Sequence, residues 1–189
     1  MNKVLLVTGG SRGIGAATAL LAAQQGWAVA VNYTANSLAA DEVVRQIRTS
    51  GGQAMSVQAD VADEAQVLRL FAHMSTRYGG DGGSIVNVSS AASRLGSPHQ
   101  YVDYAAAKGA IDAFTIGLSK EVAAEGIRVN AVRPGLIETE IHASGGLPNR
   151  VKDLQHLVPA QRGGSAEEVA EGIAEEIVAE EVVEEAEAE

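Results

Sequence analysis

Tyr104 and Lys108 are the residues whose types and spacing most directly indicate chemistry in this sequence. Four residues apart on a helix, their side chains would lie on one face. An ammonium group beside a phenol favours the tyrosinate form, so Tyr104 could act as an acid or a base nearer neutral pH. Taken alone, this spacing is a frequent coincidence in helices. The pair therefore gains meaning only from the elements that position it.

Two serines follow a short apolar run that we expect to be a buried strand, residues 85–88. Ser89 and Ser90 would then stand at the carboxyl end of that strand, where open α/β sheets build their binding sites. A serine hydroxyl at such a place can hold the carbonyl oxygen of a substrate. Upstream of the Tyr104 helix, this serine pair makes a coincidental pattern less probable than a site.

A glycine-rich segment, residues 8–15, lies between an apolar run at 4–7 and a helical segment at 16–25. Glycines let the backbone turn sharply and approach a pyrophosphate, whose charge the helix N-terminus then stabilises. The alternative is a tight turn that binds nothing. Its position at the start of a strand–helix–strand unit favours dinucleotide binding. The segment supplies the candidate cofactor-binding residues Gly9, Ser11, Arg12, Gly13, Ile14 and Gly15.

The end of the second predicted strand bears on which nicotinamide cofactor is bound. An acidic residue there would bind a ribose 2′-hydroxyl, but the segment reads Asn32-Tyr33-Thr34. The guanidinium of Arg12 could instead pair with a 2′-phosphate. The sequence thus favours NADP(H) over NAD(H), with Asn32 at the cofactor edge. The alternative for Arg12 is a solvated loop charge.

Five apolar segments alternate with four helical ones, which predicts an α/β fold. The strands are expected at 4–7, 27–33, 55–59, 85–88 and 127–132, and the helices at 16–25, 37–50, 64–78 and 102–124. Ser37 is the expected N-cap of the second helix, and Val67, Leu68, Phe71 and Met74 are expected on one apolar face of the third. This alternation predicts a Rossmann-like, three-layer αβα, doubly wound parallel sheet.

Composition excludes several classes of protein. The 189 residues include no cysteine, which excludes disulfides, thiol catalysis and thiolate metal sites, and four scattered histidines give no metal-ligand spacing. The net charge of −10 comes from residues 165–189, which hold 11 Glu and no Lys or Arg. The sequence has no cluster of basic residues of the kind that binds nucleic acids. It has no apolar run long enough for a membrane span and no segment that resembles a signal peptide. We expect a cytoplasmic protein with one domain at 1–164 and an acidic helix at 165–189 that packs on it and frays at its end.

Together these motifs resemble those of the short-chain dehydrogenase/reductase family. The matching residues are 8–15, the Asp60-Val61 pair, Ser90, Tyr104 with Lys108, and Pro134-Gly135. The resemblance implies that Ser90 orients a substrate carbonyl and that Tyr104 transfers the proton. It implies that Lys108 lowers the Tyr104 pKa and holds the nicotinamide ribose. The spacing from Ser90 to Tyr104 is typical of the family, which makes Ser89 the less probable choice.

The resemblance also implies the remaining cofactor contacts and the reaction. Asp60 and Val61 would frame the adenine, and Pro134, Gly135, Ile137 and Thr139 would lie near the nicotinamide. The reaction would be hydride transfer between NADP(H) and a small carbonyl or alcohol substrate. A homo-oligomer could form through the helix at 102–124.

The sequence departs from the family in two places. A strand unit containing Asn-Asn-Ala-Gly is missing between the third and fourth predicted strands, and Glu/Ala repeats replace the usual C-terminal segment. The remaining strands could form a sheet in the order 3-2-1-4-5, with Ser90 displaced by one strand spacing, about 4.8 Å. The alternative function is therefore a shortened scaffold that binds NADP(H) with little or no turnover. Both departures suggest an engineered sequence.

Overall fold

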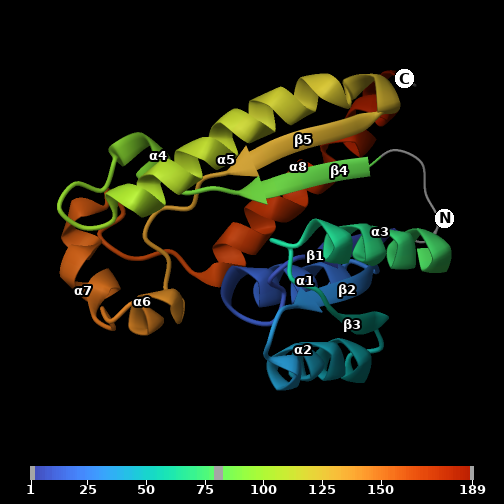
Figure 1. Cartoon of the computed structure of the whole chain (residues 1–189), viewed down its shortest axis with the longest axis horizontal. Coiled ribbons are helices and arrows are strands. Elements are labelled where there is room, and N and C mark those ends of the chain that lie inside the picture. The colour runs from blue at the N-terminus through green and yellow to red at the C-terminus, as the bar shows by residue number, and fades with distance from the viewer. Residues whose placement is uncertain (1–2, 79–82, 188–189) are drawn as a thin grey trace. The chain divides into compact units, whose positions relative to one another are not determined.

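The computed structural model of the protein describes residues 3–78 and 83–187, with side chains described at 3–74 and 83–177. The chain forms two compact units. The first comprises residues 1–80, 139–141 and 166–171, and the second comprises 81–138, 142–165 and 172–189. Figure 1 shows the helices and strands of each unit.

The first unit begins with a regular strand–helix alternation. Its elements are β1 (Val4–Val7), α1 (Gly13–Gln24), β2 (Ala28–Tyr33), α2 (Ser37–Thr49), β3 (Ala54–Gln58) and α3 (Glu64–Tyr78). The three strands form a parallel sheet in the order β1-β2-β3, with Val4 opposite Ala28 and Val29 opposite Ala54. The helices between successive strands are the crossover connections that parallel pairing requires.

The core of this unit lies between the sheet and the two helices α1 and α2. Val29 and Val31 of β2 are fully buried and belong to one cluster with Ala19 of α1 and Ile47 of α2. The neighbouring residues Ala28, Ala30 and Asn32 alternate with these valines, so they point to the opposite face of the sheet. Each fully buried valine or isoleucine side chain contributes about 1.5–3 kcal/mol. Side chains on both faces of β2 are therefore buried.

The start of α2 differs from the prediction by one residue. The N-cap is Asn36, whose side-chain Oδ1 accepts a hydrogen bond from the Ala39 backbone N–H at 3.1 Å, and Ser37 is the first helical residue. Both residue types cap helices well. The choice depends on which of them takes the non-helical backbone conformation at the end of the loop, which composition alone does not determine.

The four residues predicted on one apolar face of α3 share that face, but the structure buries them unequally. Among the described side chains of α3, residues 64–74, Leu70 is buried, at 3% exposure, whereas Leu68 and Phe71 are 65% and 58% exposed. Val67 and Met74 are half-buried. Apolar spacing fixes which residues share a face, but the neighbours available for packing decide which face is covered. The two exposed side chains are thus apolar surface that this structure leaves open to solvent.

The second unit contains the remaining strands and the longest described helix before residue 166. Its elements are β4 (Gly83–Val88), α4 (Ala92–Leu95), α5 (Val102–Glu121), the 3₁₀ helix η1 (Ala123–Glu125), β5 (Ile127–Val132), α7 (Arg150–Leu154) and η2 (Gln155–Leu157). The short α6 (Ile141–Ser144) and α8 (Ala166–Glu187) each have residues in both units. β4 and β5 pair in parallel, with Val86 opposite Asn130. α5 lies along this pair (Figure 1), and Asn87 Nδ2 donates to Thr115 Oγ1 at 3.0 Å between β4 and α5.

The strands are thus parallel and flanked by helices, as predicted, but they form two sheets. The order 3-2-1 is found in the first sheet and the pair 4-5 in the second. The predicted pairing of β1 with β4, which would have made one sheet in the order 3-2-1-4-5, is not among the strand pairs of residues 3–78 and 83–187. Strand pairing depends on close approach of two backbones, and strand-like sequence does not specify the neighbour.

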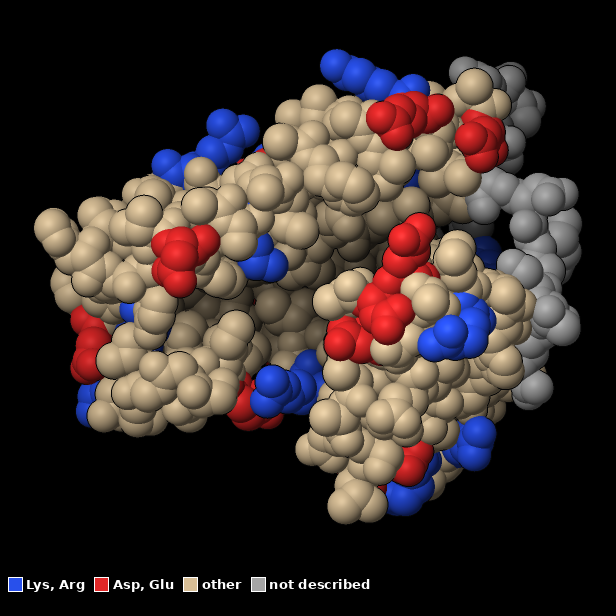
Figure 2. Space-filling model, in the orientation of Figure 1, with Lys and Arg blue, Asp and Glu red and all other residues tan. Residues whose placement is uncertain are grey.

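The described residues also bear on whether the chain has the features of a membrane-spanning, metal-binding or nucleic-acid-binding protein. No helix in the described part of the chain is long and apolar enough to cross a membrane. Within the same residues, His, Asp and Glu side chains form no group of three suited to holding a metal ion. On the face in Figure 2, the described Lys and Arg residues are interspersed with acidic and uncharged residues and form no continuous basic patch.

Candidate active site

The glycine-rich turn after β1 can form only with glycine at two positions. A Cβ on Gly15 would lie 2.5 Å from the Gly9 carbonyl oxygen, and one on Gly10 would lie 2.9 Å from the Val7 carbonyl oxygen. Gly9 also has a positive φ of 63°, which residues with side chains rarely adopt. Nothing lies within 4 Å of a Cβ placed on Gly9. The turn therefore exposes backbone at the start of α1, where a helix favours bound anions.

Asn32 supports this turn from behind. Its backbone carbonyl accepts a hydrogen bond from Gly10 N–H at 2.9 Å. Its side chain is 1% exposed, and Nδ2 donates to the carbonyls of Val57 and Ala59 at 3.2 and 3.0 Å. The amide thus joins the ends of β2 and β3 inside the unit. The structure places its side chain in the interior and not at an open edge, where the sequence had suggested a cofactor contact.

Arg12 and Thr139 lie on the accessible side of the turn. Arg12 is the N-cap residue of α1, is exposed, and makes no side-chain capping hydrogen bond. A Cβ placed on Gly13 would be 3.6 Å from Thr139 Cγ2. Thr139 is 124 residues beyond the turn in sequence yet belongs to the same unit. The tertiary structure therefore brings one of the predicted nicotinamide-side residues against the glycine-rich turn.

Asp60 and Val61 follow β3 in the same unit. Asp60 Oδ1 accepts a hydrogen bond from Ala62 N–H at 2.9 Å, and the Asp60 N–H donates to Gln66 Oε1 at 3.0 Å. These bonds organise the loop that leads into α3. Val61 is 52% exposed, so its side chain offers apolar surface at the end of β3.

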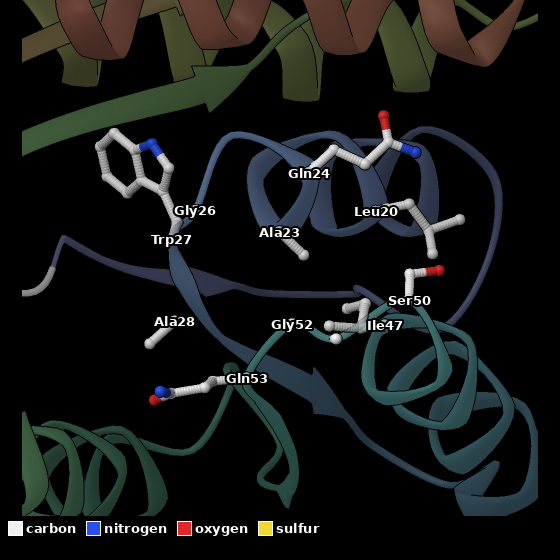
Figure 3. A pocket seen from close by; sticks show the side chains of 11 residues that line it. Leu20, Ala23, Gln24, Gly26, Trp27, Ala28, Ile47, Ser50, Gly52 and Gln53 are labelled. Atoms are coloured by element: carbon white, nitrogen blue, oxygen red, sulfur yellow. The ribbon is translucent and has the colours of Figure 1, made fainter.

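A pocket in the first unit lies away from this turn. It has a volume of about 300 Å³ and is lined by the ends of α1 and α2 and the start of β2, including Leu20, Trp27 and Ile47. Figure 3 shows these side chains around the hollow. Because β1, β2 and β3 are parallel, Trp27 precedes β2 while the glycine turn follows β1 at the opposite end of the sheet. Nucleotide sites in such sheets lie at the carboxyl ends, so this pocket is not the predicted cofactor site.

In the second unit, the end of β4 lies directly against α5. Lys108 Nζ donates to the Val88 carbonyl at 2.7 Å, and Ser89 Oγ donates to the Lys108 carbonyl at 3.2 Å. Ser89 is 2% exposed, whereas Ser90 is half-buried. Ser90 Oγ accepts a hydrogen bond from Ala92 N–H at 3.2 Å, so its own hydrogen remains available to another acceptor. Of the two serines, Ser90 is therefore the one suited to a substrate oxygen.

Tyr104 stands one turn before Lys108 and reaches solvent. Its side chain is 38% exposed, and Lys108 Nζ is 5.7 Å from the centre of its ring. Partial burial lowers the pKa of Lys108 below its ordinary value of 10.5, because burial disfavours the charged amine. The helix thus holds a tyrosine and an ammonium as neighbours, as their spacing predicted.

The segment after β5 continues this cluster. The Pro134 carbonyl accepts a hydrogen bond from Ala91 N–H at 2.9 Å, which places the Pro134-Gly135 turn beside the Ser90 turn. Nothing lies within 4 Å of a Cβ on Gly135. Ile137 pairs with Gly164 through an isolated parallel β-bridge. The Ile137 carbonyl oxygen lies 2.8 Å from His142 Nε2. His142 therefore has a role in holding this loop.

Two polar residues that the sequence analysis did not single out lie close to this cluster in the second unit. Arg133 Nε donates to Asp112 Oδ2 at 2.9 Å, and the Asp112 side chain is only 12% exposed. Asp112 follows Lys108 by four residues and Arg133 directly precedes Pro134. Extending the four-residue spacing of Tyr104 and Lys108 by one step would have found Asp112. Its partner across the fold had no signal in the sequence.

The predicted site residues accordingly divide between the two units. The first holds the glycine-rich turn with Asn32, Asp60, Val61 and Thr139, and the second holds Ser90, Tyr104, Lys108, Pro134, Gly135 and Ile137. The first group has the features of a nucleotide-binding surface. The second has a tyrosine, an ammonium and a serine hydroxyl around the end of one strand, a set of groups able to transfer a proton and orient a carbonyl.

Two family models match consecutive parts of the chain. The model described as short chain dehydrogenase matches residues 3–80, and the model described as enoyl-(acyl carrier protein) reductase matches residues 79–175. An uncharacterized oxidoreductase of Escherichia coli, YgfF, is 48% identical over an alignment of 223 positions, which covers 90% of each protein. A 3-oxoacyl-[acyl-carrier-protein] reductase of Synechocystis is 33% identical, covering 89% of this chain and 86% of that protein.

Solved structures give the same picture. The reductase LugOII, described as promiscuous and as catalysing a keto-reduction in lugdunomycin biosynthesis, superposes with a TM-score of 0.82 at 30% identity. The match covers 94% of this chain and 90% of that one. A short-chain dehydrogenase/reductase variant of Serratia marcescens gives a TM-score of 0.81 at 26% identity, over 91% of this chain and 89% of that one.

Proposed function

The chain belongs to the short-chain dehydrogenase/reductase family and is an oxidoreductase of that type, and from this premise we propose that it interconverts a ketone and an alcohol with NADP(H). Ser90, Tyr104 and Lys108 are the proposed catalytic residues. The observation that carries the proposal is the pair of hydrogen bonds between the end of β4 and α5. These bonds, from Lys108 Nζ to Val88 and from Ser89 Oγ to Lys108, fix the serine turn to the Tyr104 helix.

The glycine-rich turn is suited to a dinucleotide. Gly15 leaves room for the Gly9 carbonyl, with which a Cβ at position 15 would clash. The space next to Gly9 itself is open. A pyrophosphate can approach such a backbone closely at the start of α1. We propose that Gly9, Ser11, Gly13, Ile14 and Gly15 hold the pyrophosphate. Asp60 and Val61 would hold the adenine side, and Pro134, Gly135, Ile137 and Thr139 the nicotinamide side, while Asn32 supports the turn through its backbone carbonyl.

The protein's own groups would move and hold the proton. When bound, the nicotinamide cofactor supplies or accepts the hydride. In the reducing direction, Tyr104 gives its phenolic proton to the substrate oxygen, and Ser90 donates a hydrogen bond to the same oxygen. The Lys108 ammonium stabilises the tyrosinate that remains. Because Tyr104 is 38% exposed, it can regain its proton from solvent.

The proposed preference for NADP(H) depends on Arg12. Its side chain is exposed beside the glycine-rich turn, and β2 ends without a carboxylate that would repel a 2′-phosphate. A guanidinium can make two parallel hydrogen bonds to a phosphate. NADH, which lacks the 2′-phosphate, would not use this contact.

Calorimetric titration with NADPH and NADH tests the cofactor half of the proposal. We expect NADPH to bind more tightly, and Arg12→Ala to weaken NADPH binding by about 10- to 100-fold, as expected for a charged hydrogen bond, while NADH binding stays unchanged. Arg94→Ala is the matched control, because Arg94 is also exposed but follows the Ser90 turn. Equal affinities for the two cofactors would contradict the preference.

NADPH oxidation with a panel of ketones and 3-oxoacyl thioesters tests the reaction. The thioesters are included because a relative carries 3-oxoacyl-[acyl-carrier-protein] reductase as its name. We expect turnover with at least one ketone. A folded protein that binds NADPH and reduces no member of the panel would overturn the proposed activity.

A specific observation favours a second candidate, a shortened scaffold that binds NADP(H) with little turnover. The alignment with the E. coli relative spans 223 positions, more than the 189 residues of this chain, so the relative has residues where this chain has none. The two family models meet at residues 79–80, which supports a missing segment near that point. Inserting the corresponding segment of the relative distinguishes the candidates, since a gain of 100-fold or more, about the cost of a 1 Å misplacement, would favour the scaffold.

A further inference from the structure

We propose that Asp112 and Arg133 form a positioning pair that holds the Ser90 turn against the helix of Tyr104 and Lys108. This inference rests on the proposed function, because it assigns the pair to the same site. Neither residue is proposed to touch substrate or cofactor. Their role would be to fix the three segments that carry the groups that do.

The pair joins two of these segments directly. Asp112 lies on α5, four residues after Lys108 and eight after Tyr104, so all three share one side of the helix. Arg133 lies between the end of β5 and the Pro134-Gly135 turn. The 2.9 Å bond from Arg133 Nε to Asp112 Oδ2 therefore ties the catalytic helix to the loop after β5.

The Ser90 turn is the third segment, and it is bonded to both of the others. Ala91 N–H donates to the Pro134 carbonyl at 2.9 Å, directly after Arg133. Ser93 Oγ donates to the Ser90 carbonyl at 2.8 Å, and Ser89 Oγ donates to the Lys108 carbonyl at 3.2 Å. The turn thus contacts each of the two segments that the Asp112–Arg133 bond connects, and the Ser89 N–H adds a bond to the Val132 carbonyl at 2.8 Å. Three segments, α5, the loop after β5 and the Ser90 turn, are thus each bonded to the other two. Losing the Asp112–Arg133 bond would free α5 from the loop after β5.

The electrostatics of Asp112 agree with this arrangement. The hydroxyls of Ser89 and Ser93, together with the Arg133 guanidinium, lower the pKa of Asp112 to about 2. Its Oδ1 is buried, and in the geometry shown it receives no hydrogen bond from the described residues. Each serine hydroxyl has a single hydrogen, and both are directed to backbone carbonyls here. The carboxylate can therefore attract either hydroxyl, which couples its charge to the serine turn.

The exposed pair on α2 is a natural control. Glu42 and Arg45 also form a carboxylate–guanidinium contact, at 2.6 Å, and the pKa of Glu42 is likewise lowered to about 2, chiefly by Arg45. Their side chains are 48% and 64% exposed, and they lie three residues apart on one helix. This pair connects no separate segments. Replacing Glu42 with Gln removes the same chemistry without affecting the proposed site.

Amide hydrogen exchange followed by NMR tests the proposal without requiring turnover. In Asp112→Asn we expect the Ala91 amide to exchange at least about tenfold faster, the effect of losing one charged hydrogen bond. The amide of Val129, which is buried in β5, should not change, because the β4–β5 pairing does not depend on the pair. Glu42→Gln should alter neither amide.

Steady-state kinetics provide the second measurement. We expect Asp112→Asn to lower kcat by about 10- to 100-fold, as for a displacement of the reacting groups by up to 1 Å, with the NADPH Kd unchanged. Arg133→Gln should reproduce the loss, and the double variant should add little to either single one. Arg133→Gln replaces a side chain that is 35% exposed, so it is the variant to use if Asp112→Asn does not fold.

The outcomes separate this inference from the proposed function. An Ala91 amide and a kcat that are unchanged in both single variants would overturn the positioning role. Equal acceleration of exchange at Ala91 and Val129 would also overturn it, since that pattern reports general destabilisation. A wild-type protein that binds NADPH but has no turnover would count against the proposed function, and the exchange result would then decide the positioning role alone.

Discussion

β2 in the first unit and β4 in the second show how differently the two regions are built. In β2, Ala28, Val29, Ala30 and Val31 are at most 4% exposed, and the surrounding cluster consists of aliphatic side chains from α1, α2 and the sheet. In β4, Ile85 and Val88 are 38% and 36% exposed, and the strand is tied to α5 by polar contacts of Asn87, Val88 and Ser89.

This difference separates the source of stability from the source of chemistry. Apolar burial is non-directional and contributes about 25 cal/mol per Å², so the first unit can support a bare glycine turn that itself contributes little. Hydrogen bonds contribute less net free energy but fix direction. The second unit uses them to hold the serine turn against α5, the helix that carries the proposed catalytic residues Tyr104 and Lys108. The first unit should therefore respond to mutation mainly in stability and cofactor binding, and the second mainly in turnover.

Tyr104→Phe should have the largest effect and should separate the two regions most clearly. Removing the hydroxyl eliminates the proton donor, so kcat should fall by about 10²- to 10⁴-fold. The NADPH affinity and the melting temperature should stay close to wild type, because the hydroxyl is on an exposed side chain. Parallel kinetics and calorimetry check this. Retention of full kcat would exclude Tyr104 as the acid or base.

Ile47→Ala should cause the largest loss of stability. Ile47 is 2% exposed within the first unit's core, and truncating a buried isoleucine costs about 2–5 kcal/mol. Ile116→Ala, at a position 56% exposed on α5, is the matched control and should change stability by no more than about 0.5 kcal/mol. Urea denaturation measures both. Similar losses in the two variants would contradict the assignment of stability to apolar burial in the core of the first unit.

Gly15→Ala tests the glycine-rich turn itself. The added Cβ would lie 2.5 Å from the Gly9 carbonyl oxygen, and relieving such overpacking typically costs about 1–3 kcal/mol. We expect weaker NADPH binding together with this loss of stability. Gly109→Ala is the control, since nothing lies within 4 Å of a Cβ there. The two variants are compared by calorimetry, and an unchanged NADPH Kd in Gly15→Ala would show that the turn is not the binding surface.

The pH dependence of stability should give the smallest effect. The folded-state pKa of Asp112 is about 2, below its ordinary value of 3.8, so its carboxylate stabilises the folded protein above about pH 4 and loses that contribution as the pH falls towards 2. The difference in melting temperature between wild type and Asp112→Asn should therefore be constant above pH 4 and shrink below it. A difference that grows on acidification would contradict the ionised pair.

Much of the fold could be predicted from the sequence because its signals are local. The strand Val4–Val7 and the helix Glu64–Tyr78 were predicted with the same bounds that the structure has. Apolar runs, helical periodicity and glycine breaks each act within a few residues. The type and spacing of Tyr104 and Lys108 belong to the same class of signal, and they identified the candidate helix before any tertiary structure was considered.

Features that depend on distant partners could not be predicted in this way. In α3, Leu70 is buried and Phe71 is exposed, because burial depends on what packs against the helix. The side chain of Asn32 points to the end of β3, a choice made by two carbonyls about 25 residues away in sequence. The pairing of β4 with β5, whose sequences are about 40 residues apart, likewise depends on which backbones approach each other.

The sequence by itself determined the alternation of strands and helices, the glycine turn and the family, since each is a pattern of residue types at fixed short spacing. Only the tertiary structure decided that Thr139 lies against Gly13 and that Arg133 bonds Asp112. These contacts join residues 21 to 126 positions apart. Closing such loops costs conformational entropy that only the packing of the whole unit can offset, so no short segment of sequence contains the information.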